Sequence, residues 1–185
     1  MKLIVGLTGA SGVIYGVRLL EELKQREIKT HLVLTELAKK ILAHELGIEE
    51  VAYLATQQYD NEDLESPITS GSYEIDGMVI VPCSMKTLSG VAHGYAENLI
   101  LRAADVTLKE RRPLVLVPRE TPLNIIHLEN MLKAAKAGAI IVPAMPSYYH
   151  KPKNIDDLVN YVIGKILDVL EIPHSLYRKW GSEVG

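Results

Sequence analysis

Five short apolar runs alternate with segments of helical periodicity along this chain, and this alternation constrains its fold more than any other feature. The runs are nearly continuously apolar, which is typical of strands buried on both faces of a sheet. They span residues 2–8, 30–35, 77–84, 113–119 and 138–144. The helical patterns that follow them span residues 12–27, 36–46, 87–110, 122–138 and 154–172. Such an order predicts parallel strands joined as βαβ units.

The pattern predicts an α/β fold with a single doubly wound, mostly parallel sheet, in a three-layer sandwich of the flavodoxin-like or Rossmann-like kind. A length of 185 residues suits one domain, so we expect residues 1–185 to form a single unit. Residues 54–76 are polar and weakly periodic, and we interpret them as a loop that leads into the third strand. Ligands of such sheets bind outside the carboxyl ends of the strands, where the strand order reverses.

Charge and cysteine content exclude several classes of protein. With 20 basic and 23 acidic residues, the net charge of -3 gives no positive field for nucleic acid. The apolar runs are shorter than the roughly 18–20 residues of a membrane helix, so we expect no membrane partner. The single cysteine, Cys83, excludes an internal disulfide, and residues 1–12 are too glycine-rich for a signal peptide. We therefore expect a cytoplasmic protein.

A glycine-rich turn, TGASG, follows the first strand. Gly9, Gly12 and Gly16 allow a tight turn and close packing of the first helix, while Ser11 and the free amides of that helix face any bound phosphate. The glycine spacing matches neither the dinucleotide fingerprint nor the P-loop. We interpret the turn as a phosphate cradle, with a purely structural turn as the alternative.

Two further strand ends carry polar residues. Thr35 and Glu36 follow the second strand, where a dinucleotide-binding fold places an acid on the ribose hydroxyls. Glu36 thus leaves an NAD site open, although an acid at a helix N-terminus is equally favoured by the helix dipole. Ser84 and Thr87 open the next helix and are placed to hold an oxyanion or the polar edge of a ring, or simply to cap that helix.

Charged residues lie around the fourth strand and in the helices. Arg119 and Glu120 follow the strand directly, where the planar fork of the arginine is suited to clamp a phosphate and the glutamate to orient it or move a proton. Arg102 and Lys109 share one helix face, which either reaches a site or pairs at the surface. Lys165 lies in an apolar helical stretch, from which its ammonium group can extend to solvent.

Metal and thiol chemistry have little support in the sequence. The six histidines are scattered, and the acidic run at residues 60–63 has the character of a solvated loop. Cys83 ends an apolar strand without an activating neighbour in sequence, so we expect it to be buried and inert.

The order of several motifs resembles one family. The chain contains, in sequence, TGASG, PCSMKTLSG, LILRAADVTLKERRPLVLVPRETP, HLENMLKAAKAGA and YYHKP. Together they resemble the UbiX-type flavin prenyltransferases from residue 2 to about residue 181. The resemblance implies a domain that binds reduced FMN as a substrate and joins to it a dimethylallyl group from dimethylallyl monophosphate, without a metal. It also implies a homododecamer, and a UbiD-type decarboxylase that uses the prenylated FMN.

Site residues follow from the same resemblance by their positions in the motifs. The FMN contacts fall on Gly9, Ala10, Ser11, Thr35, Ser84, Met85, Lys86, Thr87 and Arg119. The charged active-site positions are Glu45, Arg102, Lys109 and Glu120, some of them lent across subunit interfaces. The prenyl phosphate meets Tyr149 and Lys165, and Trp180 either helps cover the site or anchors the terminus. We expect the tail, residues 173–185, to pack at a subunit interface.

The chain departs from many relatives at Lys165, where they have arginine, and from some at Leu64, where they have an aromatic residue. Lysine keeps the charge but lacks the bidentate fork. In the implied reaction, Arg119, Lys165 and the Tyr149 hydroxyl stabilise the departing phosphate, and aromatic faces stabilise the allyl cation. Glu45, Glu120 or the released phosphate accepts the flavin proton.

Three other functions are alternatives to this one. A flavin-dependent cysteine decarboxylase shares the fold, but its histidine and asparagine-containing loop are not found after the first helix. A non-catalytic FMN carrier would not need Tyr149 and Lys165 around a second phosphate. Direct decarboxylation of an aromatic acid would need a group that holds the carbanion, and the sequence offers none.

Overall fold

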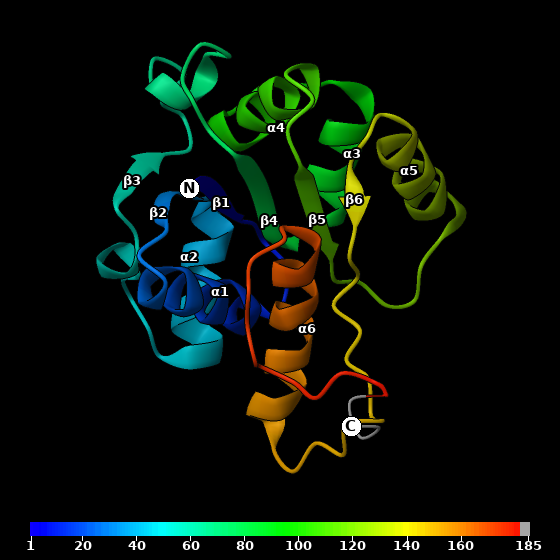
Figure 1. The fold of residues 1–185 in the computed structure, drawn as a ribbon. Helices are drawn as coiled ribbons and strands as arrows, with labels where there is room; N and C mark the ends of the chain where they lie inside the picture. The colour runs from blue at the N-terminus through cyan, green and yellow to red at the C-terminus, as the bar shows by residue number, and fades with distance from the viewer. Residues whose placement is uncertain (182–185) are drawn as a thin grey trace.

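Six parallel strands form the central sheet in the order β3-β2-β1-β4-β5-β6 (Figure 1). The structure is a computed structural model and describes residues 1–181. The strands are β1 (Lys2–Leu7), β2 (Lys29–Leu34), β3 (Gln57–Asp60), β4 (Gly77–Cys83), β5 (Leu114–Pro118) and β6 (Ile140–Ile141). All neighbouring strands in this order pair in parallel, which confirms the predicted α/β, doubly wound fold.

Helices cover both faces of the sheet and complete a three-layer sandwich (Figure 1). One face carries α1 (Val13–Gln25), α2 (Glu36–Leu46) and α6 (Ile155–Val169). The other carries α3 (Met85–His93), α4 (Leu99–Lys109) and α5 (Ile125–Lys136). Successive residues of β1 alternate between the two cores, with Leu3 and Val5 on the first and Ile4 on the second. Because both faces are covered, the central strands β1, β4 and β5 are almost entirely apolar.

The strand order reverses between β1 and β4, since β2 and β3 lie on one side of β1 and the later strands on the other. The buried Thr8 joins the two sides of this point. Its hydroxyl donates to the Pro82 carbonyl at 2.8 Å and accepts the Ser84 amide hydrogen at 2.8 Å. The loops that follow β1 and β4 are therefore held together where a ligand is expected.

Three segments differ from the sequence-based expectation. Residues 54–76, expected to be a loop, contain β3 and two short 3₁₀ helices, Ala52–Leu54 and Pro67–Thr69, of which the first begins just before this interval. The helical pattern of residues 87–110 is two helices, because the left-handed Gly94 ends α3. The last apolar run pairs over only two residues, Ile140–Ile141.

The chain after α6 turns back along that helix (Figure 1). Trp180 lies in this tail with 81% of its surface exposed. Residues 182–185 of the expected tail lie outside the described residues. Among residues 1–181, no helix combines the length and apolar character needed to cross a bilayer.

Candidate active site

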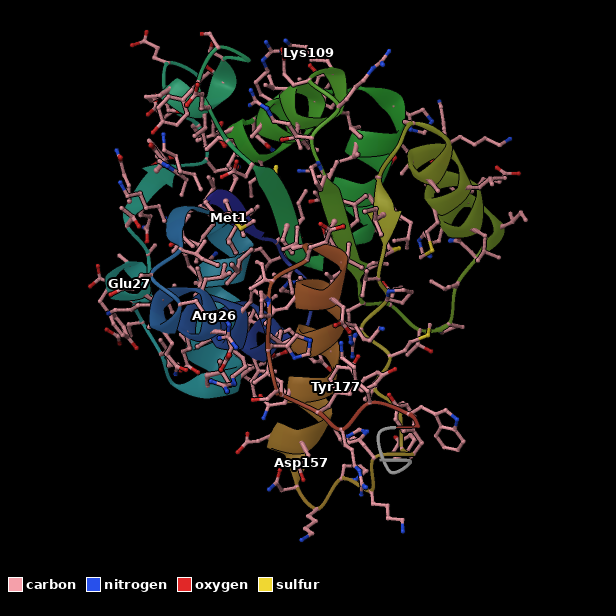
Figure 2. The ribbon with its side chains drawn as sticks, in the orientation of Figure 1. Met1, Arg26, Glu27, Lys109, Asp157 and Tyr177 are labelled. Carbon is pink, nitrogen blue, oxygen red and sulfur yellow. The ribbon has the colours of Figure 1, made fainter. Side chains whose placement is uncertain are left out.

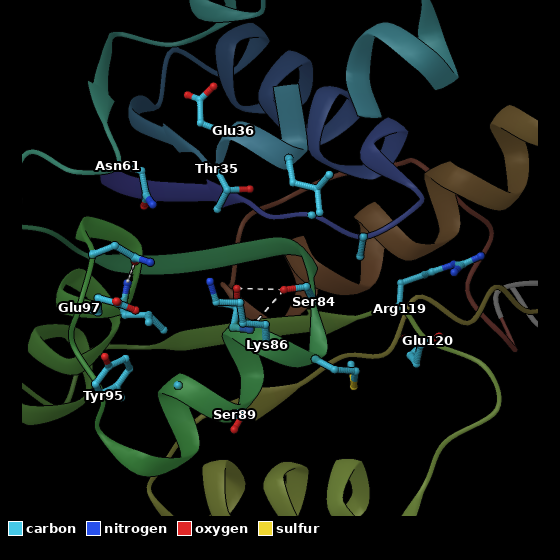
Figure 3. A pocket seen from close by; sticks show the side chains of 18 of the residues that line it. Thr35, Glu36, Asn61, Ser84, Lys86, Ser89, Tyr95, Glu97, Arg119 and Glu120 are labelled. Atoms are coloured by element: carbon cyan, nitrogen blue, oxygen red, sulfur yellow. Dashed lines mark hydrogen bonds between the residues drawn. The ribbon is translucent and has the colours of Figure 1, made fainter. Parts of the chain in front are cut away.

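A cavity of about 1170 Å³ opens at the carboxyl ends of the strands, at the point where their order reverses (Figure 3). It is lined by the segments that follow β1, β2, β3, β4 and β5, together with α3 and the connection to α4. All nine residues assigned to FMN by the resemblance line it, and so do Glu36 and Glu120. The topological rule and the family resemblance therefore lead to the same part of the molecule.

The first turn of α3 presents main-chain donors to this cavity. Ser84 caps the helix, since its Oγ accepts the Thr87 amide hydrogen at 3.2 Å and donates to the Thr87 hydroxyl at 3.0 Å. The amides of Met85 and Lys86 precede that of Leu88, which is the first to donate to a carbonyl of the helix, at Ser84. These amides and the positive end of the helix dipole suit a phosphate or the polar edge of a ring.

The first turn of α1 is different, because an internal anion already engages it. The Glu45 carboxylate, from the last turn of α2, accepts hydrogen bonds from the Gly12 amide at 2.9 Å and the Val13 amide at 3.3 Å. The cradle expected after β1 is thus only partly open. Ser11 remains on the cavity wall, whereas the free helix amides predicted from the glycine pattern are occupied.

Arg119 and Glu120 follow β5 directly and line the cavity. In Figure 3 the guanidinium group of Arg119 points to the end of the cavity opposite Tyr95 and Glu97. Tyr15 of α1 lies near this arginine: burial raises the pKa of Tyr15, and the charge of Arg119 partly offsets that effect. The Glu120 carboxylate accepts the Thr121 amide hydrogen at 2.9 Å.

The cavity is also lined by several residues that the sequence did not indicate. Asn61 follows β3, and its carbonyl and side-chain oxygens accept the amides of Leu99 and Ile100 at 2.7 and 3.3 Å. Leu37 and Tyr95 line the cavity as well, although both are largely exposed. The only sequence signal was the polar turn after residue 60, which belonged to the segment expected to be a loop.

Arg102 and Lys109 do not reach the cavity from their place on α4. Arg102 forms an ion pair with Asp105 at 2.7 Å, and Lys109 forms one with Glu110. Figure 2 shows Lys109 at the top of the molecule, with Tyr177 of the tail well below it. Within one chain, Arg102 and Lys109 thus form surface ion pairs, which is one of the two alternatives that the sequence left open.

The residues expected at the prenyl phosphate form a second group. Tyr149 contacts Trp180 and Tyr161 edge-on, with ring centroids 5.6 and 5.9 Å apart. Lys165 lies 3.5 Å from the carboxylate of Asp168. These residues do not line the cavity of about 1170 Å³. They form an aromatic and cationic cluster between α6 and the tail.

Neither a thiol nor a metal centre is found in the described residues. Cys83 is fully buried, and burial raises its pKa to about 12, so the thiolate is not populated at neutral pH. Among residues 1–181, no three His, Cys, Asp or Glu side chains are grouped to hold a metal ion.

The chain is similar in sequence to a known protein family. The model described as Flavoprotein matches residues 1–167. A flavin prenyltransferase UbiX from Methanocaldococcus jannaschii is 54% identical over 184 residues, covering 98% of this chain and 100% of the relative.

Solved structures agree with the sequence relatives. AnUbiX (PadA1) in complex with FMN and dimethylallyl pyrophosphate has a TM-score of 0.96 and 41% identity, over 98% of this chain and 97% of that one. A dodecameric FMN-dependent Ubix-like decarboxylase from Escherichia coli O157:H7 has a TM-score of 0.96 and 47% identity, over 98% and 100% of the two chains.

The cysteine decarboxylases considered as an alternative are distant. The peptidyl-cysteine decarboxylase EpiD is 16% identical, with a TM-score of 0.64, and shares only the fold. The family model, the sequence relative and the two similar structures each cover most of the chain. This chain therefore belongs to the UbiX family of flavin prenyltransferases.

Proposed function

We propose that this chain transfers a dimethylallyl group from dimethylallyl monophosphate to reduced FMN. The observation that carries the proposal is the presence of two sites in one chain, the large cavity at the strand ends and the cluster around Tyr149 and Lys165. The cavity, about 1170 Å³, is large enough for a nucleotide such as FMN. The cluster outside it offers an ammonium group and aromatic rings for the phosphate of a second molecule, which an FMN carrier would not need.

The residues of the cavity suit FMN. The hydroxyls of Ser11 and Thr35 and the first-turn amides of α3 offer hydrogen-bond partners to a phosphate and to the edge of a ring. Met85 and Leu37 add apolar surface for the ring faces. When bound, reduced FMN supplies the ring atoms to which the dimethylallyl group becomes joined.

The departing phosphate requires fixed positive charge and hydrogen-bond donors. Arg119 provides a planar fork, and Lys165 provides a point charge. Burial and the neighbouring Tyr161 raise the pKa of Tyr149, so its hydroxyl stays protonated and donates a hydrogen bond. Three such donors stabilise the charge that grows on the phosphate without a metal ion.

Two carboxylates are placed to accept the proton that the flavin ring loses. Glu120 lines the cavity directly. Glu45 lies close to the cavity wall, because its carboxylate accepts hydrogen bonds from the amides of Gly12 and Val13, next to Ser11. We propose that one of these carboxylates acts as the general base.

We further propose that residues 1–185 act as one domain within a homododecamer. In this assembly Arg102 and Lys109 reach the cavity of a neighbouring subunit, and the tail at residues 173–185 packs at an interface. The exposed face of α5 supports association, because Ile125, Ile126 and Leu132 are 67%, 60% and 56% exposed there.

The product, prenylated FMN, is a modified cofactor, so a second enzyme must use it. We propose that a UbiD-type decarboxylase receives it, and that the reaction takes place in the cytoplasm, where reducing conditions preserve reduced FMN. The buried thiol of Cys83 is compatible with that compartment.

The test is an anaerobic incubation of the purified chain with reduced FMN, without added metal. Parallel samples receive dimethylallyl monophosphate or dimethylallyl pyrophosphate, and the extracted flavin is analysed by mass spectrometry. A mass gain of one five-carbon unit with the monophosphate is expected. Unchanged flavin, with both ligands bound, would exclude the transferase. Product from the pyrophosphate alone would overturn the choice of donor.

A further inference from the structure

Four donors converge on one carboxylate between α6 and the tail. Asp168 Oδ2 accepts from the Tyr177 hydroxyl at 2.5 Å and lies 3.5 Å from Lys165 Nζ. Its Oδ1 accepts from Lys179 Nζ at 2.9 Å and lies 3.1 Å from His174 Nε2. Asp168 is the one group here that contacts both the lysine expected at the prenyl phosphate and three residues of the tail.

The tail lies directly on α6 at this point. A Cβ atom at Gly164 would come within 2.5 Å of the Tyr177 ring and 2.8 Å of the His174 ring. His174 Nδ1 accepts the Leu176 amide hydrogen at 3.2 Å, so Nε2 carries the ring hydrogen and donates to Asp168. The backbone of the tail and the carboxylate of α6 thus fix one another.

The same contacts extend to the aromatic side of the cluster. The rings of Tyr177 and Tyr161 lie 4.9 Å apart, and Tyr161 lies 5.9 Å from Tyr149. Trp180, one residue after Lys179, packs edge-on against Tyr149 at 5.6 Å. Anchoring the tail on Asp168 therefore also places the indole against the tyrosine expected at the phosphate.

Asp168 is charged and lies among cationic groups. Partial burial raises the pKa of Asp168, but hydrogen bonds from Tyr177, Lys179 and His174 outweigh it and hold that pKa well below its ordinary value. The carboxylate therefore carries one negative charge beside two ammonium groups, those of Lys165 and Lys179. Of the four contacts to this carboxylate, that of Lys165 is the longest, at 3.5 Å.

We propose that Asp168 is a positioning residue of the prenyl-donor site, which orients the Lys165 ammonium group and the tail toward the donor phosphate. This inference rests on the proposed prenyl transfer. Asp168 would act through Lys165 and would not touch the donor, because its carboxylate repels a phosphate.

The test uses the full chain and the variant Asp168→Asn, with steady-state prenylation of reduced FMN by dimethylallyl monophosphate. The KM for the donor should rise about tenfold, the loss expected for a charge-assisted contact, while kcat and the Kd for FMN stay unchanged. Simple charge repulsion predicts the opposite sign, since removing the carboxylate would then lower the KM. An unchanged or lowered KM overturns the proposal.

A double-mutant cycle with Lys165→Met separates positioning from general loss of structure. If Asp168 acts through Lys165, Asp168→Asn should add little to the KM in the Lys165→Met background. Additive effects would overturn the proposal. If Asp168→Asn does not fold, the same measurement is made on Tyr177→Phe, which removes one donor to Asp168. A raised KM for the donor then supports the proposal, and an unchanged KM overturns it. Absence of any product from the wild-type chain would instead refute the proposed function.

Discussion

The Glu45 carboxylate lies 2.9 Å from the Gly12 amide nitrogen, so residues 33 positions apart in sequence join the end of α2 to the start of α1. This contact places a negative charge at the positive end of the α1 dipole, directly behind the glycine-rich turn. The turn therefore has an internal anion as its support. The hydrogen-bond donors that remain for a ligand phosphate are Ser11 and the first turns of neighbouring helices.

Replacing Glu45 tests this support. In Glu45→Gln the amide oxygen can still accept from Gly12, so the free energy of unfolding should fall by only about 0.5–1 kcal/mol. Glu45→Ala removes the acceptor as well and should cost about 1–2 kcal/mol. Urea denaturation followed by circular dichroism measures both. Equal stability of the three proteins would show that the contact does not stabilise α1.

The proton role is tested by Glu120→Gln. Loss of a general base slows a reaction by about 100-fold or more, so prenylated FMN should form at least that much more slowly. The KM for the monophosphate should stay within about threefold, because the amide keeps the size of the side chain. Glu45→Gln is the parallel variant. A full rate in Glu120→Gln together with a slow rate in Glu45→Gln would assign the proton to Glu45.

Ser84 both caps α3 and lines the cavity. Comparison with a variant at another helix cap can separate these two roles. Ser84→Ala and Asn154→Ala each remove a cap, on α3 and α6, and each should lower the unfolding free energy by about 1 kcal/mol. Only Ser84→Ala should weaken FMN binding, measured by fluorescence titration. Equal FMN affinities in the two variants would argue against a ligand contact at Ser84.

Two glycines predict different outcomes for an added methyl group. At Gly16 a Cβ would lie 2.6 Å from the Val81 carbonyl oxygen, and this backbone atom cannot yield, so Gly16→Ala should destabilise the fold by about 1–3 kcal/mol. At Gly9 the Cβ would meet the exposed Leu37 side chain, whose end can rotate, but Leu37 Cβ at 2.9 Å requires a shift of the backbone as well. Gly9→Ala should therefore lower the unfolding free energy by about 1 kcal/mol and, because Leu37 lines the cavity, weaken FMN binding about tenfold.

The environment of His31 predicts that part of the unfolding free energy is lost at acidic pH. Burial, and then the charge of Lys2, lower the pKa of this histidine, whose Nδ1 lies 2.9 Å from the Tyr59 hydroxyl. The unfolded chain then binds a proton below about pH 6.5 that the folded chain excludes, so the stability present above that pH is lost on acidification.

Urea denaturation from pH 7.5 to pH 5 measures this component. His31→Gln should lose less stability over that range than the wild-type chain, whereas the exposed His44→Gln should follow the wild-type curve. Parallel curves for wild type and His31→Gln would exclude the assignment.

The sheet could be predicted from sequence wherever a strand is buried on both faces, as β1 and β4 are. The edge strand β3 could not, because only Tyr59 of its four residues is buried and its neighbours are polar. Its pairing depends on β2 and on the His31 contact, which no local pattern encodes.

The same division holds for the site. Residues that directly follow strands, such as Ser84 and Arg119, were predictable because parallel strands end at one edge. Glu45 and Asp168 depend on contacts between a helix and a distant segment, and their partners follow no periodicity. No sequence pattern indicates that the tail residues share one hydrogen-bond partner.

The first-turn amides of α3 have a consequence for how this site responds to mutation. Donors supplied by the main chain at Met85 and Lys86 survive any change of side chain that preserves the helix, so an alanine scan is blind to them. Only a change of the backbone itself, such as an amide-to-ester replacement, can remove such a donor. Substitutions of the side chains in this turn are therefore compatible with unchanged main-chain hydrogen bonds to a ligand.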